Sequence, residues 1–201
     1  HGADLCSRAM PSHPYVVRAV QSRDELAQVL ALQRRNLPPA LSPEEQHAQG
    51  FVTVQHDLAT LEHMHALEPS VIAVQDSDVV AYALVMPREC RARVPVLDPM
   101  FALLEGLEHR GRPLKDQRFY VMGQVCVDKA HRGTGLFDAL YHQHREQLRS
   151  RFDCVVTEVS VRNPRSLRAH ARVGFETVHT YRDASDTWAV VLWDWGAGTS
   201  R

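Results

Sequence analysis

The chain has 201 residues and carries 23 Lys and Arg residues against 24 Asp and Glu residues, a formal net charge of −1. This length suits one domain with a sizeable core. The balanced charge leaves no basic face that would imply a nucleic-acid partner. No apolar run approaches the roughly 20 residues that cross a bilayer. We therefore expect neither nucleic acid nor membrane among its partners, while a homodimer stays open.

Cysteine and histidine usage limits the compartment and the metal chemistry. None of the four cysteines forms a Cys-x-x-Cys pair, and Cys126 and Cys154 lie in apolar runs where small buried thiols are ordinary. The N-terminus lacks a signal-peptide core, so we expect a reducing, cytoplasmic location. Twelve histidines are present, but no His-x-x-x-His pair falls on a predicted helix, and no metal site is predicted.

The predicted elements begin after an N-terminal tail, 1–14, and belong to one domain, 15–196. The N-terminal half should contain a strand 15–20, a helix that Asp24 caps and Pro38-Pro39 ends, a helix start at Ser42-Pro43, a loop or strand fragment 50–54 over a pocket, and a helix 57–67.

The second half alternates strands and helices more regularly. It should contain a hairpin 71–74 and 79–86, a polar connection 87–95, a short helix 100–107, a strand 120–127, a helix 136–148, a strand 154–161, a helix after Asn163, and a closing hairpin 176–181 and 187–193. This order by itself indicates an α/β or α+β fold with a mixed sheet.

The stretch from Met122 to Phe137 has the arrangement that holds a phosphate. An apolar strand leads into a turn with Gly133 and Gly135, and a helix follows. A helix start leaves backbone N–H groups without intrahelical partners and carries partial positive charge. The glycines let the backbone approach a ligand closely, and Arg132 adds a full positive charge. The sequence therefore predicts a phosphate site at this turn.

Two known phosphate motifs are excluded at this turn. The nucleotide P-loop needs Lys-Ser or Lys-Thr after the glycines, and the dinucleotide fingerprint needs a third glycine where the chain has Asp138. The segment Arg132-Gly133-Thr134-Gly135-Leu136-Phe137 instead resembles motif A of the GNAT acetyltransferases. Phe137 departs from the family, which usually has a small residue there, so its side chain must turn away from the pyrophosphate.

A second segment resembles the family's motif B, in which an Asn opens a helix that ends at Gly-Phe. Here that helix runs from Asn163 to Gly174-Phe175. His170 stands where the family has Tyr, and Arg172 where it has Lys. The resemblance covers the C-terminal half well and the N-terminal half in outline.

The resemblance implies a mixed, mostly antiparallel sheet with a splayed central pair of parallel strands and flanking helices. It also implies acetyl-CoA as cosubstrate. In the family the pantetheine arm bonds the free strand edge in the splay, here the backbone of Val125, Cys126 and Val127, by a form of strand addition. Asn163 would bond the pantetheine amides and Ser166 would line the same channel, although Asn before Pro is also a routine helix cap.

Direct transfer to an amine requires a group that takes a proton. A lysine-like amine has a pKa of about 10.4, so at neutral pH it must lose a proton before it reacts. Glu158 lies in the middle of an apolar strand beside the splay. It is the best candidate base, because burial raises the pKa of a carboxyl group. The alternative for Glu158 is a structural ion pair with an arginine. His170 takes the position of the Tyr that assists the thiolate in the family; the alternative is a helix-face histidine bonded to solvent.

The predicted function is N-acetyltransfer from acetyl-CoA to a primary amine of a small molecule or peptide. Phe51, Tyr82 and Gln124 are candidate acceptor-site residues, although residues like the first two more often belong to a plain core. The alternative to an enzyme is a CoA-binding sensor or interaction module with the same fold. Within the chemistry, a different acyl chain or an O-acyl acceptor is the nearest rival. A Cys126 nucleophile ranks below a packing role.

Overall fold

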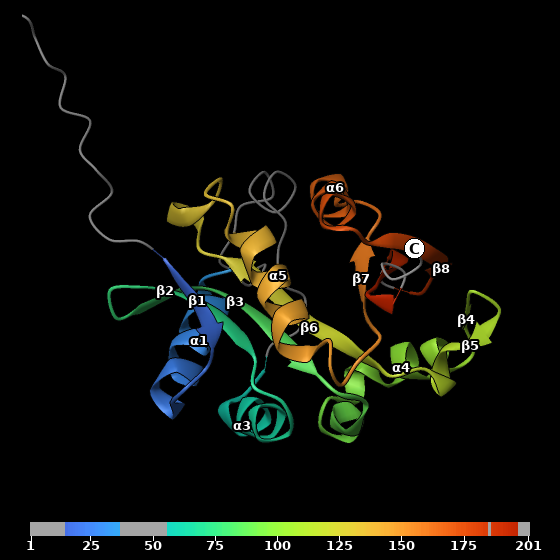
Figure 1. Cartoon of the computed structure of the whole chain (residues 1–201), viewed down its shortest axis with the longest axis horizontal. Helices are drawn as coiled ribbons and strands as arrows, with labels where there is room; N and C mark the ends of the chain where they lie inside the picture. The colour runs from blue at the N-terminus through green and yellow to red at the C-terminus, as the bar shows by residue number, and fades with distance from the viewer. Residues whose placement is uncertain (1–14, 37–55, 185, 197–201) are drawn as a thin grey trace, which may run out of the picture.

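The computed structural model describes residues 15–36, 56–184 and 186–196. A seven-stranded sheet with the order β1-β2-β3-β6-β7-β9-β8 forms the centre (Figure 1). Its strands are β1 (Val16–Ala19), β2 (Val71–Gln75), β3 (Asp78–Met86), β6 (Phe119–Val127), β7 (Cys154–Ser160), β8 (Glu176–Arg182) and β9 (Thr187–Asp194). Only β6 and β7 of these pair in parallel. The predicted mixed, mostly antiparallel sheet with one parallel pair is confirmed.

Helices cover both faces of this sheet (Figure 1). The main helices are α1 (Arg23–Arg35), α3 (Leu58–Leu67), α4 (Asp98–Glu105), α5 (Leu136–Leu148) and α6 (Pro164–Val173). One apolar core joins α1, α3 and α4 to the sheet, and two smaller clusters join α5 to the opposite face. No helix in the described part of the chain is long and apolar enough to cross a bilayer.

The helix starts follow capping chemistry, with one shift from the prediction. The α1 helix is capped by Ser22, whose hydroxyl accepts the Glu25 N–H at 3.2 Å, and not by Asp24. Asp24 lies in the first turn, where its charge favours the helix dipole. The predicted helix 57–67 is present as α3, and Asp57 caps it, since its carboxylate accepts the Thr60 N–H at 2.7 Å.

Two connections hold more structure than expected. The polar connection after β3 folds into the 3₁₀ segment Arg88–Arg93, and a two-residue pair of strands, β4 (Glu108–His109) and β5 (Arg112–Pro113), precedes β6. Such short elements leave no periodic signal in a sequence. The expected tail 1–14, the break at Pro38-Pro39, the helix start at Ser42 and the fragment 50–54 fall outside the described residues.

A bulge in β6 decides which residues face which helices. Ala83 pairs with Val125 and Val85 with Met122, so Gly123 and Gln124 together stand opposite one residue of β3. The extra residue reverses the alternation of side chains along the strand. Before the bulge Val121 joins the core under α1, and after it Cys126 does, together with Gln124 on the same face.

The α5 side of the sheet contains a buried tyrosine–histidine pair. His144 is fully buried, with Nε2 at 3.0 Å from the Ala83 carbonyl oxygen and Nδ1 at 2.7 Å from the Tyr120 hydroxyl. Because a carbonyl only accepts, Nε2 carries the proton and Nδ1 accepts from Tyr120. Burial lowers the pKa of His144 from 6.5 to about 4.

This burial predicts acid-sensitive folding. Between the unfolded pKa of 6.5 and the folded pKa of about 4 the unfolded chain binds the extra proton, so stability present above 6.5 falls with decreasing pH. The contribution of His144 should reach about 1.4 kcal/mol per pH unit inside this window. Denaturant melts from pH 7 to pH 5 should show a flatter pH dependence for His144→Phe. Parallel curves for the two proteins would contradict the assignment.

Candidate active site

The site is built on a fork between β6 and β7. The parallel ladder contains only the pairs Phe119–Cys154, Tyr120–Val155 and Val121–Val156. At the next step the Thr157 hydroxyl donates to the Met122 carbonyl at 3.1 Å. Beyond this point the two strands diverge, and the β6 edge that includes Val125, Cys126 and Val127 lines a groove. A strand edge of this kind offers backbone N–H and C=O groups to an extended ligand.

The glycine turn closes one end of the groove. Gly133 and Gly135 have φ angles of 74° and 83°, in the left-handed region that suits glycine. A Cβ at either position would meet no atom within 4 Å, so both glycines border open space. Gly135 also precedes the first residue of α5, whose N–H groups face the groove end. This turn fits a pyrophosphate, as the sequence predicts.

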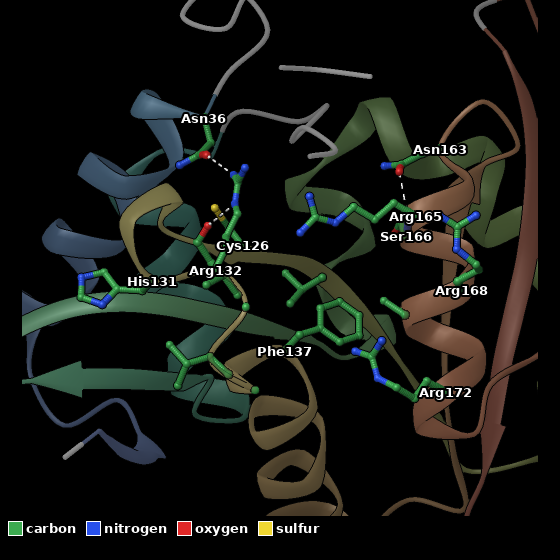
Figure 2. A pocket seen from close by; sticks show the side chains of 16 residues that line it. Asn36, Cys126, His131, Arg132, Phe137, Asn163, Arg165, Ser166, Arg168 and Arg172 are labelled. Atoms are coloured by element: carbon green, nitrogen blue, oxygen red, sulfur yellow. Dashed lines mark hydrogen bonds between the residues drawn. The ribbon is translucent and has the colours of Figure 1, made fainter. Parts of the chain in front are cut away.

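Basic side chains surround this groove. Figure 2 shows Arg132 on the glycine-turn side and Arg165 extending from α6 opposite it. Arg132 donates to the Val127 carbonyl at 3.1 Å and to the Asn36 side chain at 3.0 Å, so its guanidinium is held in place. No Asp or Glu is among the described residues that line the groove: Asn36, Val125, Cys126, Val127, His131, Arg132, Gly133, Gly135, Leu136, Phe137, Asn163, Arg165, Ser166, Arg168, Ala169 and Arg172.

The arginines of α6 were missed at the sequence level. Arg165, Arg168 and Arg172 are spaced by three and four residues, a spacing that places side chains on one helix face. That pattern was the available signal. Arg172 also forms an ion pair with Asp138 of α5 at 2.7 Å, which ties the two helices that flank the groove.

The remaining predicted groove residues divide by what their side chains do. Asn163 and Ser166 both line the groove, and Asn163 also caps α6 by accepting the Ser166 N–H at 3.1 Å. Thr134 donates its hydroxyl to the His131 carbonyl at 2.5 Å and does not line the groove, unlike the glycines on either side of it. Phe137 packs edge-to-face against Tyr141 and His170 at centroid distances of 5.1 and 5.0 Å, between α5 and α6.

A second cavity adjoins the groove at the fork and shares Val125, Asn163 and Ser166 with it. Its lining includes Gln124 from β6 and Glu158 from β7, together with Ser160 and Trp188. Glu158 shares its sheet face with Val156, which belongs to the core under α1 and α3, and the bulge turns Gln124 to the same face. Glu158 is the only charged side chain among the described residues that line this cavity.

The environment of Glu158 favours a base. Burial raises the pKa of its carboxyl group, and the Tyr181 hydroxyl donates to it at 2.5 Å, which acts in the opposite direction. The considered alternative, an ion pair with an arginine, is not present within the described residues, where Tyr181 is the partner. Tyr181 on β8 was not singled out beside Glu158 by the sequence, because their contact depends on how β8 and β9 pair.

His170 is placed differently from a solvent-bonded helix residue. It is 2% exposed, its Nδ1 lies 2.7 Å from the Ser166 carbonyl oxygen, and its Nε2 lies 2.7 Å from the Tyr141 hydroxyl. The carbonyl requires a proton on Nδ1, so Nε2 accepts from Tyr141. Burial lowers the pKa of His170 to about 4, and the ring is neutral at pH 7. Its single N–H is therefore engaged with its own helix.

Three further candidates have clear positions. Tyr82 is fully buried and lines neither cavity; the Gln124 side-chain oxygen accepts its hydroxyl at 3.2 Å, and its cross-strand partner is Cys126, which lines the groove. Burial raises the pKa of Cys126 to about 12, so its thiol is a poor nucleophile and packing explains it. Phe51 lies outside the described residues. Within the described chain, no group of three or more His, Cys, Asp or Glu side chains could hold a metal.

Comparisons with known proteins agree with this geometry. A model of the acetyltransferase (GNAT) family matches residues 27–175. The structure resembles the NatC complex bound to Gag peptide and CoA, with a TM-score of 0.60, 13% identity, and coverage of 90% of this chain and 98% of that one. It also resembles the ribosomal-protein-S18-alanine N-acetyltransferase from Escherichia coli, with a TM-score of 0.59, 14% identity, and coverage of 90% and 94%.

A third similar structure is YncA, an acetyltransferase from Salmonella typhimurium with its cofactor acetyl-CoA, at a TM-score of 0.59, 14% identity, and coverage of 90% and 94%. A comparison with curated proteins found no match. The family match spans most of the chain, and the protein belongs to the GNAT acetyltransferase family. It is an N-acetyltransferase with acetyl-CoA as cosubstrate, as the two motifs predicted.

The glycine turn can be tested with a matched pair of variants. Gly135→Glu should weaken acetyl-CoA binding about 100-fold or more, because it sets a carboxylate against the phosphates and removes charge-assisted bonds of about 1.5–3 kcal/mol. Gly111, with a φ of 72° and open space around it, lies in the β4–β5 turn away from the groove. Gly111→Glu imposes the same backbone cost and should bind normally in calorimetry. Equal affinities for the two variants would remove the turn from the phosphate site.

Proposed function

We propose that the protein transfers the acetyl group of acetyl-CoA directly to a primary amine of a small molecule or peptide, with Glu158 as the base. The observation that carries this proposal is the separation of charge across the fork. The groove of the glycine turn is lined by arginines, whereas the cavity across the fork has Glu158 as its charged group. Opposite potentials of this kind suit an anionic cosubstrate and a cationic acceptor.

The chemistry assigns one proton transfer to the protein. A bond forms between the amine nitrogen and the acetyl carbon, and the bond between that carbon and the CoA sulfur breaks. Glu158 takes a proton from the nitrogen, directly or through one water. The leaving thiol has a pKa of about 8.5, so its thiolate leaves without strong general-acid catalysis and solvent can protonate it. In this proposal, backbone N–H groups of β6 beside the fork stabilise the developing oxyanion.

The acetyl acceptor and the location extend this proposal. Two of the similar structures come from proteins described as acting on or binding protein chains, the S18-alanine N-acetyltransferase and the NatC complex with a Gag peptide. They support an amine acceptor for this chain. The four cysteines, none of them in a Cys-x-x-Cys pair, support a cytoplasmic site of action. A CoA-binding module without transfer is the alternative, and release of free CoA in the presence of an amine panel distinguishes the two.

Replacing Glu158 tests the base. Glu158→Gln should lower kcat/KM by about 10²- to 10⁴-fold, the usual contribution of a positioned base. The loss should be largest at low pH and smaller at high pH, because the fraction of free amine then rises without help. The measurement is a pH–rate profile by thiol release. Glu108→Gln, at an exposed position of β4 that lines neither cavity, is the control and should match the wild type.

The same variant separates catalysis from structure. The pKa of Glu158 is raised in the folded state, so its contribution to stability is complete below its ordinary pKa and is lost as pH rises through the folded pKa. Ionised Glu158 therefore costs stability at neutral pH, and Glu158→Gln should melt no lower than the wild type. A lower melting temperature with an unchanged rate would assign Glu158 to structure instead.

His170 receives a positioning role in this proposal. Its N–H donates to the Ser166 carbonyl and its other nitrogen accepts from Tyr141, so protonating the thiolate would require breaking a bond inside α6. His170→Ala should destabilise the fold by about 1–3 kcal/mol, because it leaves the buried Tyr141 hydroxyl without its partner. We expect kcat to fall less than about tenfold.

The leaving group gives the decisive readout for His170. A thioester with a more acidic thiol should show the same ratio of variant to wild-type rates as acetyl-CoA. A loss of about 10²-fold or more with acetyl-CoA that the better leaving group restores would establish the acid role predicted from motif B. Thermal melts of the same samples measure the structural part separately.

A further inference from the structure

A buried chain of hydrogen bonds connects α1 to the wall of the cavity that contains Glu158. Gln33 of α1 is fully buried, and its Nε2 donates to the Gln124 side-chain oxygen at 2.5 Å. The Tyr82 hydroxyl donates to the same oxygen at 3.2 Å. Buried polar groups are costly when unpaired, so such a chain holds its members in one arrangement. Both donors approach Gln124 from the side of α1 and β3.

The backbone fixes the direction of this chain. The N–H of His56 donates to the Gln33 side-chain oxygen at 2.8 Å. A backbone N–H can only donate, so the oxygen of Gln33 faces His56 and its nitrogen faces Gln124. That nitrogen also lies 3.0 Å from His56 Nδ1. Burial lowers the pKa of His56 to about 4, so the ring is neutral at pH 7 and Nδ1 accepts. The backbone N–H of His56 thus fixes the orientation of the Gln33 amide, which in turn fixes that of the Gln124 amide.

We propose that Gln33 is a positioning residue that holds the Gln124 amide with its nitrogen toward the cavity, where it donates to a carbonyl oxygen of the acceptor. Gln124 and Glu158 line the same cavity from the two arms of the fork. The Gln124 oxygen is committed to Gln33 and Tyr82. An amide nitrogen carries two hydrogens, so it can donate to an acceptor in addition to any contact within the protein.

This inference rests on the proposed function and narrows its substrate class. Glu158 would take the proton of the amine while Gln124 binds an oxygen a few bonds away. The negative charge of Glu158 disfavours a carboxylate at that distance, so a neutral carbonyl is the better partner. The acceptor class is then an amine next to an amide carbonyl, as in an amino-acid amide or the N-terminus of a peptide, in preference to a simple alkylamine.

The test compares glycinamide with ethylamine as acceptors for the full chain. We expect Gln124→Glu and Gln124→Met each to lower the ratio of kcat/KM for glycinamide over ethylamine by about tenfold or more, the cost of one lost hydrogen bond to substrate. Gln124→Glu keeps the oxygen that accepts from Gln33 and Tyr82, and Gln124→Met keeps neutral charge. The wild type and each variant are assayed with the same two amines, so the difference between the pKa values of glycinamide and ethylamine cancels from the comparison. Glu108→Gln should keep the wild-type ratio.

A variant outside the cavity tests the positioning role. Gln33→Met leaves Gln124 in place but releases its orientation, so the same ratio should fall several-fold, mainly through KM for glycinamide. An unchanged ratio in both Gln124 variants would overturn the contact with the acceptor, and an unchanged ratio in Gln33→Met alone would overturn the role of Gln33. Wild-type protein that acetylates ethylamine but not glycinamide would overturn this inference only. Failure with both amines would overturn the proposed function as well.

Discussion

The site depends on the point where β6 and β7 stop pairing. Parallel strands satisfy each other's backbone groups, and a strand edge that leaves its ladder needs other partners. Three residue pairs and the Thr157–Met122 bond hold the strands together, and beyond them the edges diverge. The groove proposed for pantetheine and the cavity proposed for the amine both open at this fork. Without the divergence the β6 edge would be covered by β7, and neither ligand could reach the other.

The bulge at Gly123 and Gln124 gives the fork its two different sides. An unbroken β6 would send Gln124 to the face of α5, with the side chains of Tyr120 and Met122. One extra residue sends it to the face of α1, where Gln33 and Tyr82 hold its amide. The glycine at the bulge is tightly packed, because a Cβ there would lie 3.1 Å from the end of the Met86 side chain, which would have to shift by a few tenths of an ångström. In the proposed function, this bulge therefore separates the site of the acetyl donor from the site of the acceptor.

The distribution of charge also differs between the two sides of the fork, and the buried histidines near them are neutral. His144 and His170 are each held neutral between a tyrosine hydroxyl and a backbone carbonyl, which lets these polar groups lie in the α5 core without charge. The charged side chains that line the two cavities differ in sign: arginines of α6 and the glycine turn line one, and Glu158 lines the other. At the position of the family Tyr, this chain has His170, whose two ring nitrogens are engaged with Ser166 and Tyr141; the proposed function therefore gives the catalytic proton transfer to Glu158.

The sequence by itself determined the order of elements, the glycine turn, the Asn163 cap and the candidate base, because each depends on local periodicity, capping or a short motif. Tertiary structure decided what these residues touch. The β6 bulge, the β4–β5 pair, the Tyr181–Glu158 contact and the burial of His170 and Tyr82 depend on strand pairing between distant segments. Pairing register and burial are properties of the assembled sheet, so a local sequence pattern does not predict them.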